Sequence, residues 1–178
     1  MKKIIVSDIT LKAIKEQDLS LTFREKLAIS ESLDKAKVDS ICLPCLSNSK
    51  EDEVIYRTIA SSINNATVMI EVGACEDGVK TASECVKNSL KSGLQVAMPV
   101  STAQMEYFYH AKAPVMLGKI KELIEKYQPA TLFTDGEWSH ESSVWHSTEF
   151  LQWLYNESSV KDFIVPNDRW GKETRGRQ

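Results

Sequence analysis

The residues best suited to chemistry lie between positions 129 and 171, in the stretch PATLFTDGEWSHESSVWHSTEFLQWLYNESSVKDFIVPNDRWG. Asp135 follows one short apolar run and Arg169 follows another, so a carboxylate and a guanidinium stand at the ends of two predicted strands. Trp138 lies close after Asp135 and offers a flat ring for stacking on a sugar. Sites of β/α barrels are built from side chains at the carboxyl ends of parallel strands. The stretch therefore predicts a sugar site of this kind.

Length, composition and charge exclude several classes of protein. The chain has 178 residues, of which 42% are hydrophobic and 26% charged, as expected for one globular domain. Its net charge of −3 provides no basic face for nucleic acid, and no apolar run reaches the roughly 20 residues of a membrane span. The apolar run over residues 4–6 is too short for a signal peptide. Four cysteines do not make a disulfide scaffold, so we expect a reduced, cytoplasmic setting.

Short apolar runs typical of strands alternate along the chain with segments of helical spacing. We predict strands over residues 4–6, 38–43, 67–72, 94–98, 131–133 and 163–165, the first of them buried on both faces of a parallel sheet. We predict helices that begin at a capping box formed by Thr22 and Glu25, at Ser49, at Asp77, at Pro114 and at Ser147.

Six strands that alternate with five helices indicate right-handed βαβ units, and therefore an α/β protein with a parallel sheet. We expect a single domain over residues 1–178, arranged as a partial or rearranged β/α barrel, because a complete barrel needs about 250 residues. An open, doubly wound, flavodoxin-like sheet is the alternative. Six strands do not close with eight-strand geometry, so a homodimer that pairs the open sheet edges is a further expectation.

From Met1 to about Ile124 the chain resembles the metal-dependent barrels of isopropylmalate, homocitrate and citramalate synthases, the DRE-TIM metallolyases. The matching segments read DITLK from Asp8, FREKL from Phe23, LQVAMPV from Leu94, STAQMEY from Ser101 and HAKAPVML from His110. Members of these families use a divalent metal ion to enolise an acyl donor or to cleave a carbon–carbon bond. The resemblance therefore implies a metal-dependent acyltransferase or lyase that acts on a small 2-oxo acid.

Only part of that family's site has a counterpart in this sequence. The resemblance makes Asp8 a metal-ligand carboxylate, and Asp8 is the one candidate ligand for a divalent metal cofactor. Lys12 stands where the family has its catalytic arginine, and Ala13 stands where it has an acidic residue. Lysine does not present the bidentate fork of arginine, and the family's His-x-His ligands have no counterpart.

From about Lys119 to Gln178 the chain resembles α-L-fucosidases of the retaining glycoside hydrolase type, with a seam between the two resemblances near residues 117–124. The matching segments read KELIEKYQP from Lys121, LFTDGEW from Leu132, WHSTEFLQWLY from Trp145 and VPNDRWG from Val165. The resemblance implies that Asp135 is the catalytic nucleophile, that Arg169 lies near the sugar, and that the partner is a fucosylated glycan. Trp138 is the best candidate for stacking on that sugar.

A retaining mechanism needs a second carboxyl group roughly 5–5.5 Å from the nucleophile as acid and base. The resemblance places this group beyond Gln178, and the family's sugar-binding histidines have no counterpart. Glu137 and Glu141 are candidates for the acid by proximity alone. We therefore expect a fucosidase-like fragment on a synthase-like half barrel with an incomplete site; the alternatives are the metal-dependent acyltransferase or lyase and a non-catalytic scaffold, engineered or recombined.

Two other groups of residues favour structure over chemistry. Cys42-Leu-Pro-Cys45 could act in redox chemistry or supply half of a zinc site, but it lacks the helix start that activates the first cysteine. The histidines are not at metal-ligand spacing, and Trp153 falls within a helical pattern typical of a core or an interface. The sequence contains no G-x-S-x-G elbow and no glycine-rich phosphate loop.

Overall fold

The computed structural model describes residues 4–46, 49–73, 76–98, 102–174 and 176, and its contacts divide the chain into two compact units, Met1–Met98 and Pro99–Gln178. Both units combine helices with parallel strands, which confirms the predicted α/β class. The boundary between the units lies upstream of the predicted seam at 117–124. That the chain forms one domain stays a prediction. In the described part of the chain, no helix is long and apolar enough to cross a membrane.

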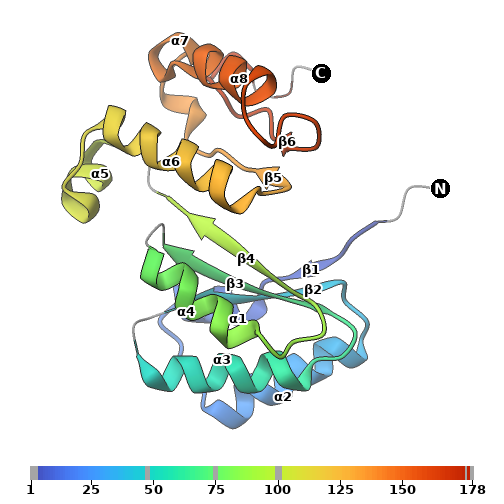
Figure 1. Ribbon diagram of the computed structural model, residues 1–178. Helices are drawn as coiled ribbons and strands as arrows, with labels where there is room; N and C mark the ends of the chain where they lie inside the picture. The colour runs from blue at the N-terminus through green and yellow to red at the C-terminus, as the bar shows by residue number, and fades with distance from the viewer. Residues whose placement is uncertain (1–3, 47–48, 74–75, 99–101, 175, 177–178) are drawn as a thin grey trace. The chain divides into compact units, whose positions relative to one another are not determined.

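The first unit is a parallel sheet whose strands are ordered as they occur in the chain. Its strands are β1 (Ser7–Asp8), β2 (Ser40–Cys45), β3 (Thr67–Gly73) and β4 (Ser92–Ala97), in the order β1-β2-β3-β4. Its helices are α1 (Thr10–Glu16), α2 (Phe23–Lys35), α3 (Lys50–Ser62) and α4 (Glu76–Val86). Figure 1 shows α2, α3 and α4 on the same side of this sheet. A doubly wound sheet requires a reversal of strand order, which these four strands do not have.

The core of the first unit lies between the sheet and these helices. Burial alternates along β2 and β3, so every second side chain points into the core. The buried strand residues are Ile41, Leu43, Val68, Ile70 and Val72, and they pack with Ile55, Ile59, Val79 and Ala82 from α3 and α4. The intervening strand residues, such as Met69 and Glu71, are only partly buried. The sheet therefore has one apolar face and one partly exposed face.

Local signals in the sequence place the starts of α2 and α3 correctly, whereas Asp77, the predicted start of the next helix, is the second residue of α4. The Thr22 hydroxyl accepts a hydrogen bond from the Glu25 amide, and the Glu25 carboxylate accepts one from the Thr22 amide, so the predicted capping box is present. Ser49 caps α3 by accepting from the Asp52 amide at 3.1 Å. The predicted helix starts at these two positions are confirmed.

The second unit is a small two-stranded sheet with helices around it. It contains α5 (Thr102–Tyr109), α6 (Ala113–Tyr127), β5 (Thr131–Leu132), a 3₁₀ turn η1 (Glu137–Ser139), α7 (Ser142–Trp145), α8 (Ser147–Asn156) and β6 (Val165–Pro166). The strands β5 and β6 are parallel, with Thr131 opposite Val165 and Leu132 opposite Pro166. The core of the unit consists of Ile124, Leu154, Val160 and Ile164, with Ile120, Leu132, Phe150, Leu151 and Trp153 packed against it. Pro114 lies in the first turn of α6, as predicted.

The first predicted strand is wrong in its bounds and in its burial. Ile4, Ile5 and Val6 are 83%, 71% and 53% exposed, and the strand consists of Ser7–Asp8. Pairing with β2 sets this position, because β2 begins at Ser40, which lies opposite Ser7. Burial on both faces was predicted for this first strand alone, and the alternation along β2 and β3 shows that those two strands are buried on one face. The helices α1, α5 and α7 were not predicted.

Candidate active site

Asp135 and Arg169 follow the carboxyl ends of two adjacent parallel strands. Asp135 lies three residues after the end of β5, and Arg169 lies three residues after the end of β6. The Arg169 guanidinium donates a hydrogen bond through Nη1 to Asp135 Oδ1, and the two side chains form an ion pair. The Asp135 side chain is 58% exposed, so a substrate can reach its carboxylate. The structure thus joins two residues that lie 34 positions apart in the sequence.

Aromatic side chains accompany this pair. The Arg169 guanidinium carbon lies 5.4 Å from the centroid of the Phe133 ring, a distance at which a cation is attracted to the ring face. Trp138 is 61% exposed and lies in η1. Gly136, between Asp135 and η1, has a φ of 104°, a conformation that glycine adopts without steric cost. The turn at Gly136 leads the chain from the carboxylate into the segment that presents Trp138.

Thr134 and Asn167 connect the two strand ends next to the ion pair. Asn167 Oδ1 accepts from the Thr134 amide at 3.0 Å, and Asn167 Nδ2 donates to the Thr134 carbonyl at 2.7 Å. The Thr134 hydroxyl lies 2.6 Å from the Arg169 carbonyl oxygen. Neither residue was predicted to have a role; the available signal was a polar side chain within two residues of the end of each predicted strand.

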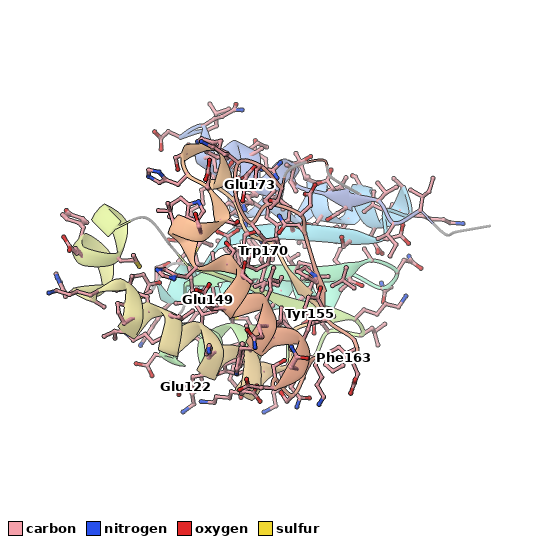
Figure 2. The ribbon with its side chains drawn as sticks, turned by 90° about the horizontal axis from the view of Figure 1, so that it is seen from above. Glu122, Glu149, Tyr155, Phe163, Trp170 and Glu173 are labelled. Carbon is pink, nitrogen blue, oxygen red and sulfur yellow. The ribbon has the colours of Figure 1, made fainter. Side chains whose placement is uncertain are left out.

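The segment that carries Arg169 is packed against α8. The ring of Trp170, which is labelled in Figure 2, stacks on Phe150 of α8 at a centroid distance of 5.6 Å and an interplanar angle of 25°. The buried hydroxyl of Ser147, at the start of α8, donates to the Trp170 carbonyl. Ser147 was predicted as the cap of α8, yet the cap is His146, which makes no side-chain capping bond. Ser147 instead ties α8 to the residue that follows Arg169.

Glu173 fastens the same segment to α7. Its carboxylate accepts hydrogen bonds from the Ser142 hydroxyl and from the Ser142 amide, the latter at 3.0 Å, at the first turn of α7. Gly171 approaches the same serine so closely that a Cβ at position 171 would lie 2.3 Å from the Ser142 nitrogen. Side chains on α8 and on α7 therefore hold the segment from Asn167 to Thr174 in place.

Replacing Gly171 by alanine is expected to destabilise the second unit. The added methyl group would also lie 2.8 Å from the Ser142 Cα, and backbone atoms cannot move aside cheaply. Overpacking of this kind costs about 1–3 kcal/mol. The matched control is Gly118→Ala on α6, where no atom lies within 4 Å and alanine should stabilise by about 0.5–1 kcal/mol. Chemical denaturation followed by tryptophan fluorescence measures both changes, since all four tryptophans lie in the second unit. Equal midpoints for the two variants would contradict the close approach.

The Glu173 contact is expected to weaken in acid. The hydrogen bond from the Ser142 hydroxyl is the largest cause that lowers the pKa of Glu173 from its ordinary value of 4.5, and backbone amides lower it further. Because folding lowers this pKa, the contribution of the Glu173–Ser142 contact to stability is complete above pH 4.5. It is lost as the pH falls through the pKa that Glu173 has in the folded protein. Hydrogen exchange should show the protection factor of the Ser142 amide declining in that range. In Glu173→Gln the protection factor of the Ser142 amide should be low and should not change with pH. If it declines in acid as much as in the wild-type, the pH dependence does not come from Glu173.

The two glutamates considered for the acid role occupy different surroundings. Glu137 is 3% exposed, so its carboxyl group is removed from solvent. Glu141 is exposed and pairs with Lys172, whose Nζ lies 3.3 Å from its carboxylate. Among the described residues, it is Arg169 that donates a hydrogen bond to the Asp135 carboxylate. A role for Glu137 or Glu141 in acid catalysis stays a prediction.

Asp8 in the first unit is engaged with the start of α1. Its carboxylate accepts from the Thr10 amide at 2.9 Å and from the Thr10 hydroxyl at 3.0 Å. Lys12 forms an ion pair with Glu71 of β3, and their hydrogen bond is the largest cause that raises the pKa of Lys12. Within the described ranges no three His, Cys, Asp or Glu side chains are arranged to hold a metal ion. Asp8 as a metal ligand stays a prediction.

Cys42 and Cys45 both lie in β2. The Cys42 sulfur lies 3.3 Å from the Ser7 hydroxyl, and the strand has an irregularity between Leu43 and Cys45. Cys75, which follows the strand predicted over residues 67–72, lies outside the described residues. A strand does not supply the helix N-terminus that activates a redox cysteine. The position of Cys42 and Cys45 in β2 therefore favours a structural role for them over redox chemistry.

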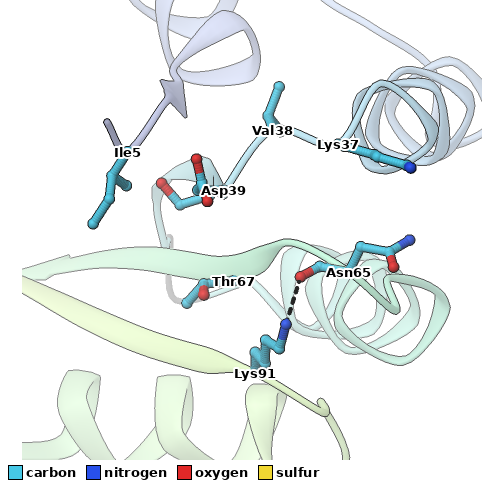
Figure 3. Close-up of a pocket in the computed structure, with 8 residues that line it drawn as sticks. Ile5, Lys37, Val38, Asp39, Asn65, Thr67 and Lys91 are labelled. Atoms are coloured by element: carbon cyan, nitrogen blue, oxygen red, sulfur yellow. Dashed lines mark hydrogen bonds between the residues drawn. The ribbon is translucent and has the colours of Figure 1, made fainter. Parts of the chain in front are cut away.

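A shallow pocket of about 600 Å³ opens at the amino end of the first sheet (Figure 3). It is lined by Ile5, Lys37, Val38, Asp39, Ser40, Asn65, Thr67 and Lys91. Ser40 and Thr67 are the first residues of β2 and β3, and Lys91 donates to the Asn65 carbonyl at 3.0 Å. Functional sites of parallel β/α sheets form at the opposite, carboxyl end. The pocket is therefore a poor candidate for a catalytic site.

Known proteins match the part of the chain that carries Asp135 and Arg169. The family model described as alpha-L-fucosidase matches residues 95–178, a range that begins upstream of the predicted seam. A rat tissue alpha-L-fucosidase is 45% identical over 82 residues, which are 46% of this chain and 15% of that protein. A Dictyostelium discoideum alpha-L-fucosidase is 44% identical over 63 residues, 35% of this chain and 14% of that protein. The human tissue enzyme is 43% identical over 67 residues, 38% of this chain and 14% of that protein.

The chain thus spans about 15% of the length of these relatives. The resemblance of the fucosidase-like part is confirmed, and the resemblance of the N-terminal part to the synthases stays a prediction. Residues 95–178 are thus similar to one segment of the alpha-L-fucosidases, which are glycoside hydrolases.

Proposed function

We propose that the site at the ends of β5 and β6 is the nucleophile side of a retaining α-L-fucosidase site. The observation that carries the proposal is the ion pair between Asp135 and Arg169, which lies within the matched range. The substrate is a terminal α-L-fucosyl group of a glycan. The activity of the complete enzymes in the family is part of this proposal.

In the proposed reaction an oxygen of the Asp135 carboxylate attacks the anomeric carbon of the fucoside. A carbon–oxygen bond to the enzyme forms while the bond to the leaving group breaks, and water later hydrolyses the resulting ester. The hydrogen bond from Arg169 holds Oδ1, which leaves Oδ2 free to attack. Trp138, exposed after the Gly136 turn, offers a surface for the apolar face of the sugar.

The choice of leaving group decides whether the proposal can be tested on this chain. Natural glycosides need a general acid to protonate the departing oxygen, and the identity of that acid is part of the proposal. An aryl α-L-fucoside whose phenol has a low pKa leaves without protonation. Its cleavage therefore depends mainly on Asp135 and on the binding of the sugar.

The test is release of the phenol from such an aryl α-L-fucoside, with the matching aryl β-D-galactoside and α-D-mannoside as controls. Release from the fucoside alone supports the proposal. Equal release from all three sugars points to non-specific chemistry and rejects it. Absence of release, together with absence of fucose binding by calorimetry, reduces the site to a remnant on a non-catalytic scaffold.

A second proposal concerns the first unit alone. Its sequential parallel strands, with α2 to α4 on one face, have the arrangement of successive strands in a β/α barrel, which supports the predicted barrel-type fold. The resemblance to the synthases adds a divalent metal at Asp8 and a 2-oxo acid substrate. Calorimetry with Mg²⁺, Mn²⁺ and Zn²⁺ tests this, since binding that is lost in Asp8→Asn would support it and the absence of binding would end it.

A further inference from the structure

Thr134 and Asn167 extend the connection between β5 and β6 beyond the strands themselves. The two strands pair over only two residues each. Beyond that point Asn167 accepts from the Thr134 amide at 3.0 Å and donates to the Thr134 carbonyl at 2.7 Å. One side-chain amide therefore satisfies both backbone groups of Thr134, as the next backbone in a sheet would.

The Thr134 hydroxyl adds a third connection. Its oxygen lies 2.6 Å from the Arg169 carbonyl oxygen and 2.9 Å from Asn167 Oδ1. A hydroxyl group has a single proton. We assign this proton to the Arg169 carbonyl because that acceptor is nearer. The hydroxyl thereby fixes the backbone of the residue that carries the guanidinium.

Each of these bonds acts on a residue of the Asp135–Arg169 pair or on its neighbour in the chain. Thr134 precedes Asp135 directly, so the bonds from Asn167 fix the backbone from which the carboxylate projects. The hydroxyl bond fixes Arg169 itself. Thr134 and Asn167 are partly buried, whereas the Asp135 carboxylate is exposed, so the pair is held from its less exposed side.

We propose that Thr134 and Asn167 are a positioning pair, which holds the Asp135 carboxylate and the Arg169 guanidinium at hydrogen-bond distance. Neither side chain needs to touch the substrate. The structural part of the proposal is independent of the reaction; only its effect on the rate rests on the function proposed above. A catalytic group that moves by about 1 Å can lose a factor of about 10² in rate.

Three variants of the full chain test the pair. Thr134→Val removes the hydroxyl and keeps the shape of the side chain, and Thr134→Ser restores the hydroxyl. Thr131→Val makes the same change on an exposed side chain in β5, three residues earlier. The first readout is the exchange with water of the Arg169 Nη1 protons, which donate to Asp135 Oδ1, measured by NMR. We expect this exchange to be about tenfold faster in Thr134→Val than in wild-type, which corresponds to about 1.4 kcal/mol, and unchanged in the other two variants.

The second readout is the kinetics of aryl α-L-fucoside cleavage. In Thr134→Val we expect kcat to fall by a factor of about 10 to 10² while KM changes by less than about threefold, because the nucleophile is displaced and not removed. Thr134→Ser should recover most of the rate. A merely structural role would lower the folded fraction, seen by tryptophan fluorescence, without lowering kcat per folded molecule.

The outcomes of these two experiments separate the positioning pair, its effect on the rate and the proposed function. Unchanged Arg169 exchange in Thr134→Val overturns the positioning pair, whatever the activity. Faster exchange with unchanged kcat overturns its role in the reaction. Faster exchange in a protein whose wild-type form releases no phenol supports the positioning pair and rejects the proposed function.

Discussion

Asp135→Asn is expected to lower the rate of aryl α-L-fucoside cleavage by a factor of about 10³ or more. Asparagine keeps an oxygen that can accept the hydrogen bond from Arg169, so the geometry of the site should survive. The neutral amide, however, is a far weaker nucleophile than the carboxylate. A factor of 10³ corresponds to about 4 kcal/mol of transition-state stabilisation.

The matched control for this variant is Asp162→Asn. Asp162 is an exposed carboxylate in the same unit, so its replacement should leave the rate and the tryptophan fluorescence unchanged. The free energies of unfolding of the two variants should agree within about 0.5 kcal/mol, as is usual for exposed substitutions. A rate for Asp135→Asn within tenfold of wild-type would mean that another group attacks the sugar.

Asp34→Ala is expected to produce the largest loss of stability, about 3 kcal/mol or more in the first unit. Asp34 is 6% exposed and lies on α2. Its carboxylate accepts from the amides of Asn64, Asn65 and Ala66, the last at 2.8 Å, and from the Asn65 side chain. Alanine would leave all of these donors without their acceptor at the turn between α3 and β3.

Separate probes distinguish the two units in this experiment. All four tryptophans lie in the second unit, so fluorescence follows that unit, whereas far-ultraviolet circular dichroism also follows α2, α3 and α4. In Asp34→Ala the circular dichroism midpoint should fall while the fluorescence midpoint stays. Glu31→Ala, a substitution on the same helix, is the control. It should change the free energy of unfolding followed by either probe by no more than about 0.5 kcal/mol. An Asp34→Ala protein as stable as Glu31→Ala would refute the assigned role.

The same carboxylate gives a pH dependence. Burial raises the pKa of Asp34, but the hydrogen bonds from the amides of Ala66, Asn65 and Asn64 outweigh burial, so the pKa lies below its ordinary value of 3.8. The stabilisation is therefore complete above pH 3.8 and is lost as the pH falls through the folded value.

Local chemistry in the sequence predicts the class of fold and the helix starts at Thr22 and Ser49, but not the start of α8. The capping box of Thr22 and Glu25 is readable because both partners lie within one turn of the chain. The position of β1 is not readable in this way, because pairing with β2 decides which residues form the strand, and the apolar residues Ile4 to Val6 lie outside it. The role of Asp34 as a hydrogen-bond acceptor could not be predicted either, because its donors lie about 30 positions away in the sequence.

The same distinction applies to the candidate site. Asp135 and Arg169 stand out by their type and by their place after apolar runs, and the structure pairs them. Asn167 and Thr134 do not stand out, because an amide and a hydroxyl at strand ends are common in turns. Their importance appears only when parallel pairing of β5 with β6 brings them together.

The most direct test of the central claim is covalent trapping with a 2-deoxy-2-fluoro-L-fucosyl fluoride. Fluoride leaves without protonation, and fluorine at C2 slows hydrolysis of the ester, so the fucosylated enzyme should accumulate. Intact-protein mass spectrometry should show one fluorofucosyl group per chain, and peptide mapping should place it on Asp135. The absence of an adduct, or an adduct on another carboxylate such as Glu137 or Glu141, would contradict Asp135 as the nucleophile.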